Sequence, residues 1–163
     1  MKWIYGKQDF KTLSRGQENC YLLTNGLGGF SSLTTTGSVT RNDHALLMAC
    51  TKAPNHRYNL IHRLKEEIRI GEEKQILSAQ EFADGTKEEG YQHLSAFSFE
   101  DTPVWRWETK GVRIRKEIGM TQQENTVAVV YEMKNQSLFD AELVVTPFLQ
   151  FVRKGEDLTE EQG

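Results

Sequence analysis

Three glycines lie within four positions, between an apolar run and a Thr/Ser-rich run: Gly26, Gly28 and Gly29. Asn25 precedes the first of them and forms with it a dipeptide typical of tight turns. Glycine reaches positive φ without steric cost and lets other groups approach the backbone closely. Arg41 and His44 follow soon afterwards. The pattern predicts an irregular loop. An arginine and a histidine that follow it could face the same side of the fold as this loop.

The arginine and the histidine allow more than one interpretation. Arg41 and His44 could bind sugar hydroxyls, or they could contact a loop of a partner domain. They could also be an exposed arginine and a histidine whose hydrogen bonds are satisfied inside the fold. The glycine loop has a similar alternative, because a tight turn between two strands would need the same residues. These alternatives stay open on the residues alone.

Phosphate binding by the glycine loop is disfavoured. A dinucleotide fingerprint needs a third glycine three positions after Gly28, and Ser31 stands there. A Walker loop would end in Gly-Lys-Ser/Thr, which this run does not supply. No helix is predicted to begin after Phe30, so no helix N-terminus would hold an anion.

The run Leu22 to Phe30 and the residues after it resemble the N-terminal domain of bacterial and archaeal glycogen debranching enzymes, the amylo-α-1,6-glucosidase family. A second block carries the resemblance further: Thr40, Arg41, His44, Leu46 and Leu47. The chain departs from the family pattern at a few positions, namely Tyr21 for tryptophan, Phe30 for tyrosine, Asp43 for tyrosine and Ala45 for glycine. Looser similarity extends to Thr146-Pro-Phe148, so the resemblance covers most of the chain.

The resemblance implies an all-β fold, an antiparallel β-sandwich of the supersandwich type that precedes glucoamylase-like α-toroid domains. Residues 1–163 would form that single domain, and the catalytic α-toroid domain of the same polypeptide would be its partner. The expected function is non-catalytic: packing on the catalytic domain and helping to position an α-glucan for α-1,6-glucosidic hydrolysis. The residues expected at the substrate or at the domain interface are Asn25, Gly26, Gly28, Gly29, Phe30, Arg41 and His44. A stand-alone glycogen- or starch-binding module and a purely structural domain are the alternatives.

Composition is that of an ordinary globular domain. The 163 residues are 37% hydrophobic and 26% charged, and 23 acidic against 20 basic residues give a net charge of −3. No basic block indicates nucleic-acid binding, and no apolar run reaches the length of a membrane span. Cys20 and Cys50 lack paired spacing, which predicts free thiols and a cytoplasmic location. The tail from Gly155 to Gly163 is acidic and shows no terminating pattern, which suggests that the chain is part of a longer polypeptide.

The second half of the chain alternates apolar and polar residues with a period of two. Gly111 to Thr121 does so except at Lys116, and in Thr126 to Lys134 one face carries Val127, Val129, Tyr131 and Met133. Trp105 and Trp107 fall on one face of another such segment, and Ala141 to Phe151 is rich in Val, Leu and Phe. Short alternating strands at regular spacing predict antiparallel sheets packed as a sandwich or closed as a barrel.

The first half predicts strands with less regular patterns. Ala45 to Cys50 fits a fully buried strand. Asn59 to Ile70 also fits a helical stripe, but a hairpin at Gly71 favours two strands, the second ending at Phe82. Asp9 to Ser14 fits a short helical turn. Ala83 to Gly90 is predicted to be a charged, exposed loop, and the charges of Lys65-Glu-Glu67 to be solvated.

No catalytic residue, metal ligand set or cofactor is assigned. Glycosidases need two carboxylates at a set separation, and nothing selects a pair among 23 acidic residues. The histidines are scattered, without cysteines or carboxylates at ligand spacing. Trp3 is left open between a sugar platform and an interface anchor. Trp105 and Trp107 are expected in the core or on the concave sheet face.

Overall fold

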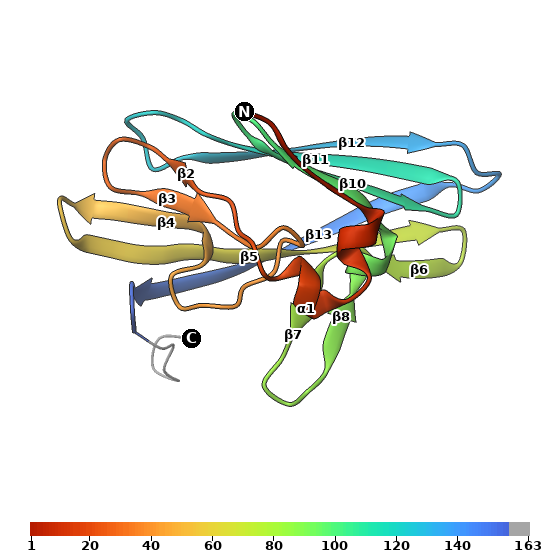
Figure 1. Ribbon diagram of the computed structural model, residues 1–163, viewed down its shortest axis with the longest axis horizontal. Coiled ribbons are helices and arrows are strands. Elements are labelled where there is room, and N and C mark those ends of the chain that lie inside the picture. Colours follow the sequence, from red (N-terminus) through yellow and green to blue (C-terminus); the bar gives the residue numbers. More distant parts are fainter. Residues whose placement is uncertain (157–163) are drawn as a thin grey trace.

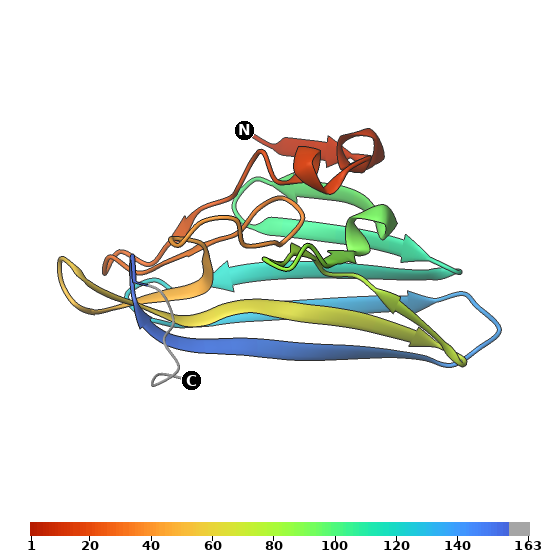
Figure 2. The same ribbon diagram turned by 90° about the horizontal axis from the view of Figure 1, so that it is seen from below.

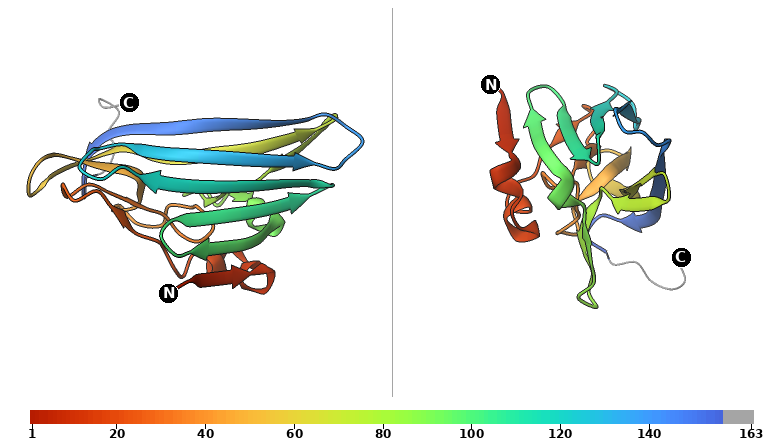
Figure 3. Two further views of the ribbon diagram at one scale, coloured as in Figure 1. Left: turned by 90° about the horizontal axis from the view of Figure 1, so that it is seen from above. Right: turned by 90° about the vertical axis from the view of Figure 1, so that its right-hand side faces the viewer.

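The computed structural model describes residues 1–156, which fold as two antiparallel sheets packed face to face (Figure 1). The first sheet has five strands in the order β1-β9-β10-β11-β12. Its strands are β1 (Trp3–Gly6), β9 (Leu94–Phe99), β10 (Pro103–Thr109), β11 (Val112–Met120) and β12 (Val127–Asn135). The end-on view shows this sheet facing the second sheet across the core (Figure 3).

The second sheet has six strands, five of them in the order β13-β5-β4-β3-β2, with β6 added beside β5. Its strands are β2 (Leu23–Thr24), β3 (Phe30–Ser32), β4 (Ala45–Lys52), β5 (His56–Ile70), β6 (Glu73–Ile76) and β13 (Ala141–Arg153). A small hairpin of β7 (Ala79–Glu81) and β8 (Lys87–Glu89) projects from the body of the sandwich (Figure 1). All strand pairs within the described range are antiparallel.

Short helical turns accompany the sheets: η1 (Lys7–Phe10), α1 (Leu13–Gly16) and η2 (Gly90–His93). The first two lie beside β1 at one side of the molecule, and the edge strands β12 and β13 run along the opposite side (Figures 2 and 3). The helical turn expected between Asp9 and Ser14 is therefore present as two separate turns. The all-β sandwich predicted from the sequence is confirmed.

The alternating patterns place their apolar faces in the core. Val112, Ile114 and Ile118 of β11 are buried, and alternate residues of β12 pack partly against the same cluster. Trp105 and Trp107 of β10 are buried in that cluster, as expected. The Trp105 ring meets Tyr21 edge-on at a centroid distance of 5.5 Å. The indole N–H donates to the Thr35 carbonyl oxygen at 2.9 Å, so its polar atom is satisfied.

Lys116 interrupts the alternation of β11 and points into the core, because it lies on the same face of the strand as Ile114 and Ile118. Its ammonium group forms an ion pair with the Glu66 carboxylate of β5, and both side chains are 3% exposed. Tyr131 donates its hydroxyl hydrogen to the same carboxylate at 2.8 Å. The Lys116 ammonium also lies 4.9 Å from the centre of the Trp105 ring. The expectation that the charges of Lys65-Glu-Glu67 are solvated is wrong for Glu66, because its partner comes from the opposite sheet.

Two other local predictions are corrected. The strand expected from Gln75 to Phe82 divides into β6 and β7, because the backbone N–H groups of Leu77 and Ser78 both donate to the Glu66 carbonyl oxygen. The loop expected at Ala83 to Gly90 is partly a strand, β8. Glu88 of that strand forms a bidentate ion pair with the buried Arg63, with two N···O distances of 2.9 Å.

The strand expected at Asn59 to Ile70 is confirmed as part of β5, and the Ala45 to Cys50 segment is buried in β4. Cys20 and Cys50 are both free thiols. Most of the acidic tail from Gly155 to Gly163 lies outside the described residues.

Candidate functional site

The glycine loop connects β2 to β3, and its glycines are needed for two different reasons. Gly26 and Gly28 have φ angles of +79° and +91°, a region that other residues rarely adopt. Gly29 is needed for close packing, because a Cβ there would lie 2.7 Å from Asn25 Nδ2 and 2.8 Å from Asn125 Oδ1. The loop therefore has a fixed shape that the sequence specifies locally.

Asn25 holds the loop from inside. Its side chain is fully buried, and Oδ1 accepts hydrogen bonds from the backbone N–H groups of Leu27 and Gly29 at 2.9 and 3.0 Å. Nδ2 donates to the Glu124 carbonyl oxygen at 2.9 Å and to Asn125 Oδ1 at 3.0 Å. Every polar atom of this amide is used within the fold, so Asn25 shapes the loop and its side chain does not line the pocket beside it.

Asn125 extends the same connection to a third element. It lies in the turn between β11 and β12, and its side chain bonds both backbone groups of Cys50 in β4. Nδ2 donates to the Cys50 carbonyl oxygen at 3.0 Å, and Oδ1 accepts from the Cys50 N–H at 3.3 Å. The two asparagines thus join the glycine loop, the end of β4 and a turn of the other sheet.

The predicted residues other than Asn25 line one shallow pocket of about 570 Å³. The glycine loop forms part of its wall, and the segment before β4 supplies Arg41 and His44. The complete lining is Cys20, Leu22, Thr24, Gly26, Gly28, Gly29, Phe30, Ser32, Arg41, Asp43, His44, Arg57 and Lys154. We call this concavity the glycine-loop pocket.

Arg57 and Lys154 are lining residues that the sequence did not reveal. The Arg57 guanidinium donates through Nε to the Gly28 carbonyl oxygen at 2.6 Å, which fixes the loop from the β5 side. Lys154 donates its backbone N–H to the Arg57 carbonyl oxygen at 2.8 Å. Neither residue carries a local sequence signal, because each reaches the pocket through strand pairing across the second sheet.

His44 is the buried polar group of the pocket. It is 2% exposed, and its Nδ1 accepts a hydrogen bond from the Thr40 backbone N–H at 3.1 Å. Burial lowers the pKa of the imidazole, and the positive charge of Arg41 lowers it further. The ring is therefore neutral near pH 7, and with Nδ1 as the acceptor its proton sits on Nε2. That Nε2 has no hydrogen-bond partner among the described residues.

The lining can donate hydrogen bonds but offers little for acid–base hydrolysis. Arg41, Arg57 and Lys154 supply cationic donors, and among the described residues Asp43 is the one carboxylate on the pocket wall. A glycosidase mechanism uses two carboxyl groups on either side of the scissile bond. The arrangement suits binding to hydroxyl or carbonyl oxygens rather than bond cleavage.

Two features of the described range bear on other classes of function. No group of three or more His, Cys, Asp or Glu residues there could hold a metal ion. No helix within residues 1–156 is long and apolar enough to cross a membrane.

The fold and the pocket together define an antiparallel β-sandwich domain with a rigid glycine loop at the edge of a shallow, donor-rich concavity. The family profile described as "Glycogen debranching enzyme N terminal" matches residues 19–163. The chain therefore belongs to this family, and it is a glycogen debranching enzyme N-terminal region. No curated protein and no solved structure matches the chain significantly.

Proposed function

We propose that this chain is a non-catalytic accessory domain of a glycoside hydrolase of the amylo-α-1,6-glucosidase type. In this role it packs on a catalytic domain of the same polypeptide. Its glycine-loop pocket faces the α-glucan and helps to position it for α-1,6 hydrolysis. The observation that carries the proposal is the convergence of the glycine loop, Arg41 and His44 on one pocket wall.

The donors of the pocket suit a sugar ligand. Arg41 is exposed and can turn toward a hydroxyl oxygen. The His44 Nε2–H is a donor without a partner in the described part of the chain, but it is buried, so Arg41 is the accessible donor of the two. Arg57 is held by its bond to Gly28, so it braces the wall.

Packing on another domain is supported by apolar side chains along the open side of the sandwich, where β12 and β13 are edge strands (Figure 2). Exposed apolar side chains occur on these strands and on the turn between them: Val130, Met133, Leu138, Phe139, Phe148, Leu149 and Phe151. Large exposed apolar side chains near a sheet edge are compatible with a protein interaction surface.

The test uses Arg41→Ala in a full-length parent enzyme. Hydrolysis of a limit dextrin should fall, whereas the free energy of unfolding of the domain should change by less than about 0.5 kcal/mol, as for other exposed positions. Arg113→Ala, which removes an exposed arginine of β11, is the matched control and should leave both quantities unchanged. The isolated chain should release no glucose from the dextrin. The proposal fails if Arg41→Ala unfolds the domain or leaves debranching intact.

A stand-alone carbohydrate-binding module is the second candidate, favoured by one observation. Trp3 is 56% exposed and lines a groove of about 300 Å³ together with Tyr5 and Phe99. Aromatic faces stack against sugar rings, so the groove could hold a glucan by itself. Maltooligosaccharide binding by the isolated chain that is lost in Trp3→Ala would favour this candidate over the accessory domain.

A further inference from the structure

A second pocket opens where the ladders on both sides of β5 change register at the same place. On the β4 side, Leu47 pairs with Ile61 but Met48 pairs with Asn59. On the β13 side, Leu149 pairs with Ile61 but Val152 pairs with Asn59. Bulges of this kind redirect side chains and recur beside functional sites.

The resulting pocket has a volume of about 460 Å³, within the range of about 300–1,000 Å³ typical of small-molecule sites. We call it the bulge pocket. Residues of β5 and β13 line it, including Asn59, His62 and Gln150. It shares Arg41 and Lys154 with the glycine-loop pocket, so the segment before β4 separates two concavities.

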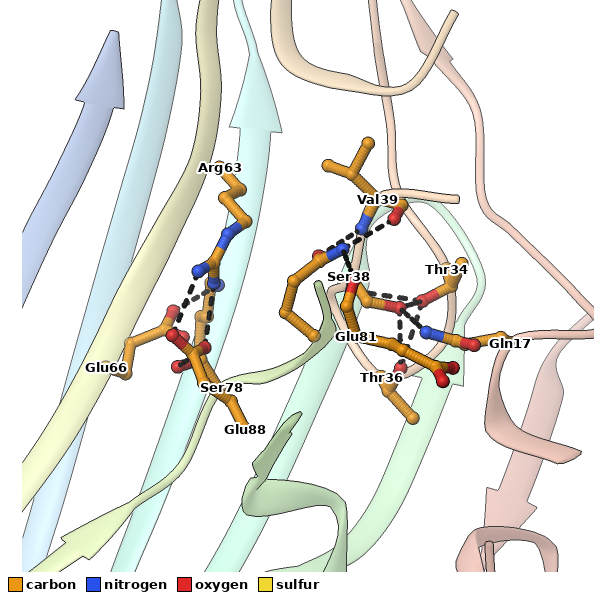
Figure 4. A network of polar contacts seen from close by, with 12 residues as sticks. Gln17, Thr34, Thr36, Ser38, Val39, Arg63, Glu66, Ser78, Glu81 and Glu88 are labelled. Carbon is orange, nitrogen blue, oxygen red and sulfur yellow. Dashed lines mark hydrogen bonds and ion pairs between the residues drawn. The ribbon is translucent and has the colours of Figure 1, made fainter. Parts of the chain in front are cut away.

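Hydrogen bonds hold the side of the pocket that Gln17 and Val39 form (Figure 4). Gln17 of this wall donates to the Ser38 hydroxyl at 3.0 Å, and Ser38 belongs to a buried cluster of hydroxyl groups with Thr34 and Thr36. Gln80 bonds both backbone groups of Val39, donating to its oxygen at 2.8 Å and accepting from its nitrogen at 2.9 Å. The side of the pocket formed by Gln17 and Val39 is therefore preorganised.

Asn59 and His62 form the polar floor. Asn59 is 5% exposed, and its Nδ2 donates to His62 Nδ1 at 3.1 Å. This bond leaves the imidazole proton on Nε2. Burial, followed by the positive charge of Arg63, lowers the pKa of His62, so the ring is neutral near pH 7. The Asn59 Oδ1 atom is buried without a partner among the described residues.

The chemistry of the lining favours an uncharged ligand. Amide side chains come from several elements, and the charged residues of the described lining are of both signs, with Arg41, Arg153 and Lys154 against Glu81 and Glu156. The two glutamates offset most of the attraction that the three cations would have for a phosphate or carboxylate. Amides and neutral imidazoles both donate and accept hydrogen bonds, as a ring of hydroxyl groups requires.

We propose that the bulge pocket is a second binding site, which takes a single uncharged sugar unit. The choice of a glucose unit, rather than another polyol, rests on the proposed function. Within residues 1–156 the lining includes no Tyr, Phe or Trp side chain, so a sugar is held there by its hydroxyl groups and not by stacking. A terminal unit of a glucan fits that requirement better than the middle of a chain, because its hydroxyl groups are accessible around the ring.

The two pockets have separate reporters for an NMR titration of the isolated chain. His62 lines only the bulge pocket, and His44 lines only the glycine-loop pocket. With ¹⁵N-labelled imidazoles, maltose should shift the His62 resonances, and inorganic phosphate at the same concentration should not. Gln150→Ala should weaken the maltose effect on His62 by about 3- to 10-fold, the loss of one hydrogen bond. Gln136→Ala, an exposed glutamine in a turn, should leave it unchanged.

The other outcomes overturn the proposal. A shift of His44 alone would assign the sugar to the glycine-loop pocket, which leaves the proposed function standing and removes the bulge pocket as a site. A response of His62 to phosphate alone would make the pocket an anion site. No response of His62, or a maltose response that persists unchanged in Gln150→Ala, would also exclude sugar binding there.

Discussion

Replacing Asn25 by alanine tests whether the glycine loop depends on one buried amide. The change removes the donor Nδ2, which leaves the Glu124 carbonyl oxygen and Asn125 Oδ1 without the hydrogen bond from Asn25. It also leaves the backbone N–H groups of Leu27 and Gly29 without their acceptor. We expect Asn25→Ala to lower the free energy of unfolding and to loosen the loop.

The magnitude follows from which of these groups water can reach. The Gly29 N–H is buried, and leaving it unsatisfied costs about 1–3 kcal/mol. Leu27 is 37% exposed, so its N–H can bond water at small cost. Asn125 Oδ1 keeps its bond from the Cys50 N–H. The sum, with the net loss of the two Nδ2 bonds at about 0.5–1.5 kcal/mol each, is about 2–6 kcal/mol.

Urea unfolding of the wild type and the variant at pH 7.5 measures this difference. Asn135→Ala is the matched control, because Asn135 also uses both ends of its amide, toward Phe139 and Ser137, but is exposed. Its replacement should cost less than about 1 kcal/mol, since water can replace the lost bonds. Equal costs for the two variants would refute the reasoning, because the buried bonds of Asn25 would then add nothing.

Three further predictions concern stability. Gly28→Ala should cost about 1–2 kcal/mol in urea unfolding, because alanine is strained at the φ of +91°. Lys116→Met should cost about 3–5 kcal/mol by leaving the Glu66 carboxylate buried without its cation, whereas Lys116→Met with Glu66→Leu should recover most of that loss. The free energy of unfolding should fall as the pH drops below about 6.5, because the lowered pKa values of His44 and His62 make the unfolded chain bind protons more readily.

Each of these predictions has its own control. Gly85 has a φ of +84° in open space, so Gly85→Ala isolates the backbone cost. A double variant at Lys116 and Glu66 that is no more stable than Lys116→Met would show that the ion pair is not the cause. His62→Gln should reduce the loss of stability between pH 7.5 and 5.5, and an unchanged loss would remove this histidine from the explanation.

The sequence predicted those features whose causes are local. The alternation that runs through β11 and β12 is a property of adjacent residues, and the structure follows it within a residue or two. The positive φ angles of Gly26 and Gly28 are likewise predicted by the residue type, because glycine adopts them without steric cost. Sheet pairing and side-chain direction then follow from the period of two.

The features that were missed depend on partners far along the chain. The local sequence predicts a surface charge at Glu66, because its ion-pair partner Lys116 lies in the other sheet. It predicts a charged loop at Glu88, because the partner Arg63 comes from a distant part of the chain. Asn25 looked like a ligand residue, but its amide bonds a turn about one hundred positions away. Local patterns cannot reveal such pairs.

The bonds between Asn25 and the Glu124–Asn125 turn also constrain how the protein folds. They join residues separated by 99 and 100 positions in the chain. Contacts at such separation carry a large loop-closure cost and form slowly in β proteins, typically over milliseconds to seconds. The glycine loop can therefore take its final shape only after both sheets have formed and docked. Loss of amide-exchange protection at Gly29 would accordingly report the opening of the whole sandwich, not the local fraying of one loop.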